Sequence, residues 1–190
     1  MNLVLLAGSP SAQSRSTRLL LHVGDRLASC GLTPHLLQVR DLPAAALLHA
    51  DFRDPDILAA QEIVRQADAI VVATPIYQAS FSGVLKAFLD LLPQSALTGK
   101  AVLPLAVGGS QSHMLALDYA LRPVLAALGS HHILPGIYAT EAQIKLQGES
   151  GLILDAAIAE RVAGGIGQLT ASLLHAQSGS ELAPALLRIA

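Results

Sequence analysis

The chain begins with an almost unbroken run of apolar residues, and a Gly-Ser-Pro turn at positions 8–10 ends that run. Four further short, mostly apolar runs follow. We expect strands in all five places: Met1–Ala7, His35–Val39, Ala69–Thr74, Ala101–Val107 and His132–Tyr138. Because these runs lack the alternation that marks a half-exposed strand, they indicate a parallel sheet that is covered on both faces.

Segments with apolar residues at helical spacing separate the strands. In the first segment, Ser14 or Ser16 would cap the helix and Gly31 would end it. Its apolar face consists of Leu19, Leu20, Val23 and Leu27. The other predicted helices are Asp56–Gln66, Gly83–Leu92, His113–Leu128 and Ile153–His175.

This alternation of strands and helices predicts an α/β fold. Since crossover connections are right-handed, few arrangements are open to such a chain. We expect the flavodoxin-like one, a five-stranded parallel sheet of order 2-1-3-4-5 with helices on both faces. Residues 1–176 would form one domain, and residues 177–190, entered through Ser178-Gly179-Ser180, would form a C-terminal tail.

The composition favours an assembly of several copies. Of the 190 residues, 52% are apolar and 14% are charged. The charged share lies well below the roughly 25% that is usual in soluble proteins. So few charges cannot cover the surface of a monomer of this size, and we expect apolar surface to be buried in a homo-oligomer.

The same counts argue against several kinds of partner. A net charge of −2, 3% aromatic residues and no Trp leave neither a basic patch nor a stacking platform for nucleic acid. The apolar runs are far shorter than the ~20 residues that span a bilayer, and the N-terminus does not resemble a signal peptide, so we expect a cytoplasmic protein without membrane contact. His131 and His132 would point to opposite faces of a strand, so no metal site is predicted.

The loop after the first strand carries the clearest candidate chemistry, because open α/β sheets bind ligands beyond the carboxyl ends of their strands. It places a cluster of donors at a helix N-terminus: Ser9, Ser14, Arg15, Ser16 and Thr17. Such an end attracts anions, and the obvious ligand is a phosphate. The alternative is a hydroxyl-rich helix cap. The loop lacks both the Gly-x-Gly-x-x-Gly fingerprint and the Walker lysine, which argues against Rossmann and P-loop sites.

Two more loops reach the same edge of the predicted sheet. The candidate residues are Pro75, Ile76 and Tyr77 after the third strand and Gly108, Gly109 and Ser110 after the fourth. The first group can turn backbone donors and acceptors toward a planar ligand, and the glycines let the backbone approach a flat ring closely. Each loop alone also fits an ordinary connection. Together, the three loops describe a slot for a phosphate and a ring, which fits FMN.

These residues resemble the NADPH-dependent FMN reductase family over nearly the whole chain. The matching motifs are Leu6-Ala7-Gly8-Ser9-Pro10 with Ser14-Arg15-Ser16, Ala73-Thr74-Pro75-Ile76-Tyr77 with Ser82-Gly83, and Gly108-Gly109. The segment 117–125, Leu-Asp-Tyr-Ala-Leu-Arg-Pro-Val-Leu, is similar to the reductases of two-component alkanesulfonate monooxygenase systems.

The resemblance implies a homotetramer that uses NADPH to reduce FMN and passes the reduced flavin to a separate FMN-dependent alkanesulfonate monooxygenase. The first loop would hold the phosphate and the other two would flank the isoalloxazine ring. The helices that contain Lys86 and Tyr119 would form subunit contacts. Relatives can carry a basic residue within positions 11–13, where this chain has Ser-Ala-Gln, so Arg15 would carry the phosphate charge alone.

Tyr119 stands where such relatives have a tyrosine in a π-helical bulge. The sequence gives an independent reason for a distortion, because Pro123 lacks an N–H and leaves the Tyr119 carbonyl without its helical partner. A bond from the Val124 N–H to that carbonyl would be of the π type, and a simple proline kink is the alternative. Tyr119 would modulate flavin release. No catalytic side chain is required, since the hydride passes between cofactors.

Two other functions fit the same slot. An enzyme that retains FMN and reduces quinones, azo dyes or metal oxyanions would need the same loops. A flavodoxin-type electron carrier would bind FMN without NADPH, but such carriers are strongly acidic, and this chain has a net charge of −2.

Overall fold

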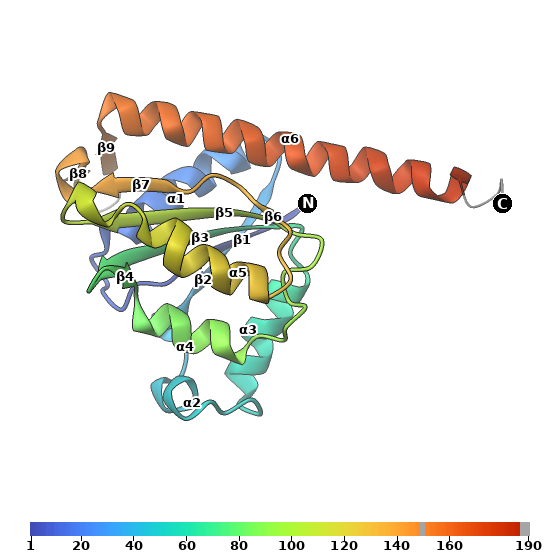
Figure 1. Cartoon of the computed structure of the whole chain (residues 1–190), viewed down its shortest axis with the longest axis horizontal. Coiled ribbons are helices and arrows are strands. Elements are labelled where there is room, and N and C mark those ends of the chain that lie inside the picture. The colour runs from blue at the N-terminus through green and yellow to red at the C-terminus, as the bar shows by residue number, and fades with distance from the viewer. Residues whose placement is uncertain (149–150, 187–190) are drawn as a thin grey trace.

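The computed structural model describes residues 1–148 and 151–186, with residues 176–186 as helix backbone only. A central sheet has helices on both faces (Figure 1). Its parallel strands are β1 (Asn2–Ala7), β2 (Thr33–Gln38), β3 (Ala69–Tyr77), β5 (Ala101–Gly108), β6 (His132–Ile133) and β7 (Ile137–Thr140). They lie in the order β2-β1-β3-β5, with β6 and β7 together beside β5. The predicted flavodoxin-like class is confirmed, and the order differs slightly from 2-1-3-4-5 because β6 and β7 together take the place of the fifth strand and a short strand is added beside β3.

The strand count differs from the expected five, because the sheet has seven strands. The predicted strand His132–Tyr138 is divided into β6 and β7, since the intervening Pro135-Gly136 pair does not continue the ladder. A short antiparallel strand, β4 (Ser80–Phe81), pairs with the end of β3.

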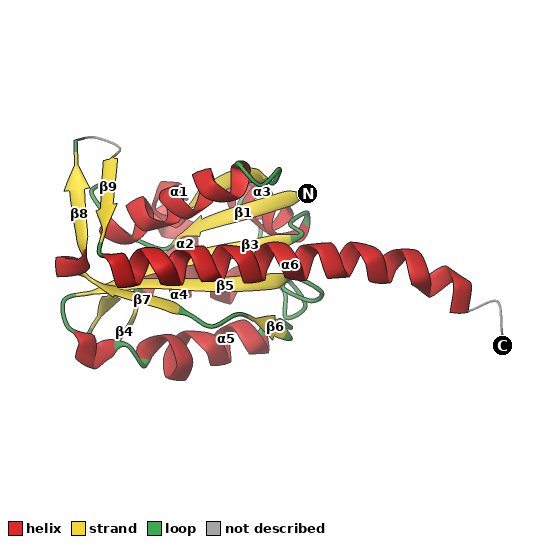
Figure 2. Ribbon diagram, turned by 90° about the horizontal axis from the view of Figure 1, so that it is seen from above, coloured by secondary structure: helices red, strands yellow, loops and turns green. Residues whose placement is uncertain are grey.

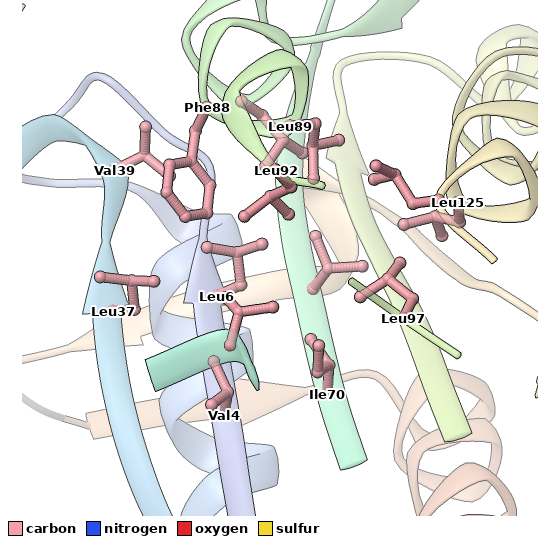
Figure 3. Packing of buried hydrophobic residues seen from close by; sticks show 14 of the residues in the cluster. Val4, Leu6, Leu37, Val39, Ile70, Phe88, Leu89, Leu92, Leu97 and Leu125 are labelled. Carbon is pink, nitrogen blue, oxygen red and sulfur yellow. The ribbon is translucent and has the colours of Figure 1, made fainter. Parts of the chain in front are cut away.

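The two faces of the sheet have separate apolar cores. On one face, α1 (Arg15–Ala28) and α6 (Ala156–Leu186) pack against Leu3, Leu5 and their neighbours. On the other face, α3 (Pro55–Arg65), α4 (Gly83–Leu91) and α5 (Arg122–Ala127) cover Val4, Leu6 and Ile70. Figure 3 shows Phe88 and Leu89 of α4 packed over these strand residues. Both sides of the central strands β1, β3 and β5 are largely buried, so these strands are continuous apolar runs, whereas the edge strand β2 is mostly exposed.

Local capping residues fix where the helices begin. Ser14 caps α1, Asp54 caps α3 and Ser82 caps α4, each by accepting a hydrogen bond from a backbone N–H of the first turn. The six-residue helix α2 (Ala44–His49) was not predicted. The predicted helix His113–Leu128 is instead a 3-10 turn (Gln111–His113), a π-helix (Leu117–Leu121) and α5.

The C-terminal third departs most from the expectation. A hairpin of β8 (Ile144–Gln147) and β9 (Gly151–Leu154) stands at the end of the sheet that carries β4 (Figure 2). Because β9 uses residues that the predicted helix Ile153–His175 included, α6 begins later, and it continues to Leu186. The helix therefore runs across position 176, and the division into domain and tail stays a prediction. Within the described residues, no helix combines the length and apolar character needed to cross a bilayer.

Candidate functional site

The hydroxyl loop folds into a turn around the N-terminus of α1, and Ser9, Ser14 and Ser16 are all buried there. The Ser14 Oγ accepts from the Thr17 N–H at 3.3 Å and lies 2.8 Å from the Ser16 Oγ. The Ser9 Oγ accepts from the Ser11 N–H at 3.2 Å. Capping of α1 explains why a hydroxyl is buried at Ser14, but it does not explain the buried hydroxyls of Ser9 and Ser16. The other two buried hydroxyls supply further donors beside the positive end of α1, as an anion site requires.

Arg15 extends from the first turn of α1 toward the end of β7. Its Nη1 donates to the Glu141 carboxylate, with 3.1 Å between Nη1 and Oε2. Its Nε is buried and has no hydrogen-bond partner among the described residues. Sequence reasoning did not single out Glu141, because 126 positions separate it from Arg15.

Side-chain hydrogen bonds join the first loop to the third strand. The Ser82 Oγ donates to the Gly8 carbonyl and accepts from the Leu85 N–H at 3.2 Å. The Thr74 Oγ1 accepts from the Ser82 N–H at 3.0 Å and donates to the Pro75 carbonyl at 2.9 Å. Thr74 and Ser82 are fully buried, and a Cβ on Gly8 would lie 2.7 Å from the Leu85 Cβ. The loops therefore have little freedom to move apart.

The segment after the third strand is a hairpin and not the loop that was expected from Thr74 onward. β3 continues through Pro75 and Ile76 to Tyr77 and turns back into β4. The two turn residues, Gln78 and Ala79, have φ of 48° and 62°. This is the left-handed conformation of a two-residue hairpin turn, and it is strained for residues with a side chain. The hairpin leaves the Tyr77 side chain half exposed.

Tyr138, in the neighbouring strand β7, holds the glycine loop by a hydrogen bond. Its hydroxyl donates to the Ser110 carbonyl, and a Cβ on Gly108 would lie 2.2 Å from that hydroxyl. Burial raises the pKa of Tyr138 above its usual range, which lies well above neutral pH already, so the phenol is a protonated donor at neutral pH with or without this shift. Tyr138 was missed as a site residue. The sequence did hold a sign of its role, because Tyr138 ends the predicted strand next to the one that leads into Gly108 and Gly109.

The helix after the glycine loop contains the expected π-type bond, at a different place. The Arg122 N–H donates to the Leu117 carbonyl, five residues earlier, so the bulge lies at Leu117–Leu121 and includes Tyr119. The expected bond from Val124 to Tyr119 is not the one that defines it. Tyr119 is 79% exposed, the largest exposed fraction among the large apolar residues of this end, which also include Tyr77, Met114 and Leu115.

These elements enclose a cavity of about 130 Å³ at the carboxyl ends of the strands. Its lining contains eight of the predicted residues: Ser9, Ser14, Arg15, Ser16, Pro75, Ile76, Tyr77 and Gly108. Thr17, Gly109 and Ser110 lie outside it. The volume is below the ~300–1,000 Å³ of sites that enclose a whole ligand. A ligand that has both a phosphate and a ring would therefore lie partly outside the enclosed volume.

A larger hollow of about 590 Å³ lies at the opposite edge, between α6 and the amino ends of β5 and β6. The loops that follow β1, β3 and β5 do not reach it. Since ligands of parallel sheets bind at the carboxyl ends of strands, the smaller cavity is the candidate site.

Comparison with known proteins identifies the family of the chain. The family model described as NADPH-dependent FMN reductase matches residues 1–144, which include all three loops. An enzyme named FMN reductase (NADPH) from Pseudomonas putida is 51% identical over 144 residues, which are 76% of this chain and 73% of the relative. A protein of the same name from Escherichia coli is 44% identical over 144 residues, covering 76% and 75% of the two chains.

Solved structures are similar over more of the chain. The apo form of an NADH:FMN oxidoreductase, EMOB, superposes with a TM-score of 0.82 at 37% identity and covers 90% of this chain and 89% of its own. The match extends beyond residue 144, so it includes part of the segment that contains the β8–β9 hairpin and α6.

Proposed function

The chain belongs to the NADPH-dependent FMN reductase family, and from this premise we propose that it reduces free FMN and supplies the reduced flavin to an FMN-dependent alkanesulfonate monooxygenase. It is an NAD(P)H:FMN oxidoreductase whose cofactors are FMN and NADPH. The single observation that carries the proposal is the small volume of the cavity, about 130 Å³, which is too small to enclose a whole FMN. A flavin that is held mainly at one end can dissociate.

The residues of the chain would bind and orient the cofactors. The hydroxyls of Ser9 and Ser16, the N-terminus of α1 and the free Arg15 Nε would hold the phosphate. The backbone at Ile76 and Gly108 would flank the ring, and Tyr77 would lie beside it. When both cofactors are bound, NADPH supplies a hydride and FMN accepts it. Positioning then dominates the rate, because the chain has no proton to deliver in that step.

Support for the monooxygenase partner comes from the segment 117–125 and from the π-helix within it. The test is a coupled reaction that contains this protein, NADPH, oxygen, an alkanesulfonate and a purified alkanesulfonate monooxygenase. We expect sulfite release that requires both proteins and added FMN. Sulfite release at the same rate with a purely chemical source of reduced FMN is the positive control for the monooxygenase. If that control works and this protein gives no sulfite, the partner is wrong.

We further propose a homotetramer in the cytoplasm. Met114, Leu115 and Tyr119 form an exposed apolar surface on one protomer. A second apolar groove, between α4 and α5, is lined by Leu89, Val124 and Leu128. Two separate surfaces allow two kinds of interface, as a tetramer with dihedral symmetry needs. Light scattering after size-exclusion chromatography measures the mass directly, and a monomer at micromolar concentration would contradict the assembly.

A further inference from the structure

We propose that Glu141 weakens phosphate binding by occupying Arg15, so that FMN dissociates more readily than it would from the unpaired arginine. The inference rests on the proposed function, because it takes the hydroxyl loop as the place of the FMN phosphate. The inference assigns a role to Glu141, which lies outside the three loops and directly follows β7.

The position of Glu141 is fixed by its own turn. Glu141 begins the 3-10 turn Glu141–Gln143, which a capping box closes: the Thr140 N–H donates to the Gln143 side-chain oxygen at 3.0 Å. The turn directly follows β7, which pairs with β5 up to Gly108. The backbone of Glu141 is therefore fixed at the rim of the cavity, and its carboxylate meets the Arg15 Nη1 there at 3.1 Å.

The charges of the cavity make this contact important. Among the residues that line the cavity, all of them in the described part of the chain, Arg15 is the one cation and Glu141 is the one anion. Their charges cancel. A phosphate would have to share the guanidinium with a carboxylate of the same sign, and this repulsion raises the free energy of the bound state.

The contact weakens binding without preventing it. Glu141 uses only the Nη1 of Arg15, and the buried Nε has no partner among the described residues. One donor therefore remains for a phosphate, together with the serine hydroxyls. Both side chains are partly exposed, 41% for Arg15 and 56% for Glu141, so water and salt moderate the interaction.

The test compares the full-length wild type with Glu141→Gln, which keeps the shape of the side chain and removes its charge. The dissociation constant of FMN is measured by quenching of flavin fluorescence, and the dissociation rate by rapid dilution. For the variant we expect FMN binding to be about two- to fivefold tighter at low salt, the size of a partly exposed charge interaction. The dissociation rate should fall by a similar factor, and the gain should shrink at high salt.

Riboflavin, which has the same ring but no phosphate, separates this mechanism from a change elsewhere in the site. Its affinity should be equal in the wild type and in Glu141→Gln. Glu62→Gln is the matched control, because Glu62 pairs with Arg65 on α3 and does not line the cavity. It makes the same change in net charge and should leave FMN binding unchanged. Thermal unfolding shows whether each variant is folded.

The outcomes separate the two proposals. If the wild type binds neither FMN nor riboflavin, the proposed function fails and this inference fails with it. If the wild type binds FMN but Glu141→Gln binds it equally or more weakly, Glu141 does not compete for Arg15, and the proposed function stands. An equal gain for riboflavin would also overturn the inference, because the effect would not pass through the phosphate.

Discussion

In the hydroxyl loop, where we propose that the phosphate binds, and in the segment bonded to that loop, five hydroxyl side chains are buried, whereas at the proposed ring end the large apolar side chains are exposed to solvent. The buried set is Ser9, Ser14, Ser16, Thr74 and Ser82, and the exposed set is Tyr77, Met114, Leu115 and Tyr119. The first end is joined across the sheet by the Ser82 bond to Gly8. At the second end one such bond joins the Tyr138 hydroxyl to the Ser110 carbonyl, and it leaves the four large apolar side chains exposed.

Under the proposed function, one protomer supplies the phosphate end by itself, whereas the ring end needs a further molecule to cover it. The phosphate end is formed by short loops that follow adjacent strands, so its shape comes with the fold. The ring end exposes apolar surface that a neighbouring copy, NADPH or a flavin would cover. A rigid phosphate site beside an exposed ring site suits a flavin that binds, is reduced and dissociates.

Gly8→Ala should give the largest effect at the phosphate end. The new Cβ would lie 2.7 Å from the Leu85 Cβ in a packed interior. We expect the free energy of unfolding to fall by about 1–3 kcal/mol, as in other overpacked cores. FMN affinity should fall as well. Urea unfolding and fluorescence titration measure the two effects.

Gly109→Ala is the matched change at the ring end. A Cβ there meets nothing within 4 Å. Its free energy of unfolding should stay within about 0.5 kcal/mol of the wild type. Equal destabilisation by the two substitutions would break the comparison between the two ends.

Tyr119→Ala should change function more than it changes folding, because the side chain is 79% exposed. We expect the purified variant to retain more flavin and to oxidise NADPH more slowly with free FMN. Absorbance of the purified protein and steady-state rates measure both. Tyr119→Phe, which keeps the ring, is the control. If Tyr119→Ala retains no more flavin and reacts as fast as the wild type, Tyr119 has no part in release.

Tyr138→Phe tests the hydrogen bond that holds the glycine loop between the two ends of the site. The substitution removes the hydroxyl that donates to the Ser110 carbonyl. We expect the free energy of unfolding to fall by about 0.5–1.5 kcal/mol, the usual net value of one hydrogen bond. FMN affinity should also fall, because the glycine loop loses its support. Unchanged affinity with reduced stability would limit Tyr138 to a structural role.

Ala79→Gly should give a small effect of the opposite sign and should stabilise the protein. Ala79 has a φ of 62°, which glycine adopts without strain. The gain should be about 0.5–1 kcal/mol, since the more flexible unfolded chain offsets part of it. Ala59→Gly, at an exposed position inside α3, should destabilise by a similar amount. Thermal melts of both variants check the opposite signs.

The sequence predicted the parts of the structure that depend on local pattern. Apolar runs located the parallel strands of the sheet, and Ser14, one of the two candidate caps, is the residue that caps α1. The break between β6 and β7 was missed because the run continues through Pro135. The hairpin after β3 was missed because Gln78 and Ala79 are not typical residues for its turn.

The candidate site divides in the same way. The three loops could be predicted because each follows an apolar strand in the chain. Glu141 and Tyr138 could not, because their roles depend on contacts with Arg15 and Ser110, which are far away in the sequence. The resemblance suggested a π-helix at Tyr119, but the bond that forms it begins at Leu117.

The most direct test of the central claim follows NADPH oxidation by the purified protein with and without added FMN, after its flavin absorbance has been recorded. A site that anchors only the phosphate predicts a nearly colourless protein that oxidises NADPH only when FMN is supplied. A yellow protein that reduces quinones without added FMN would contradict the account, because its flavin would then be a retained prosthetic group.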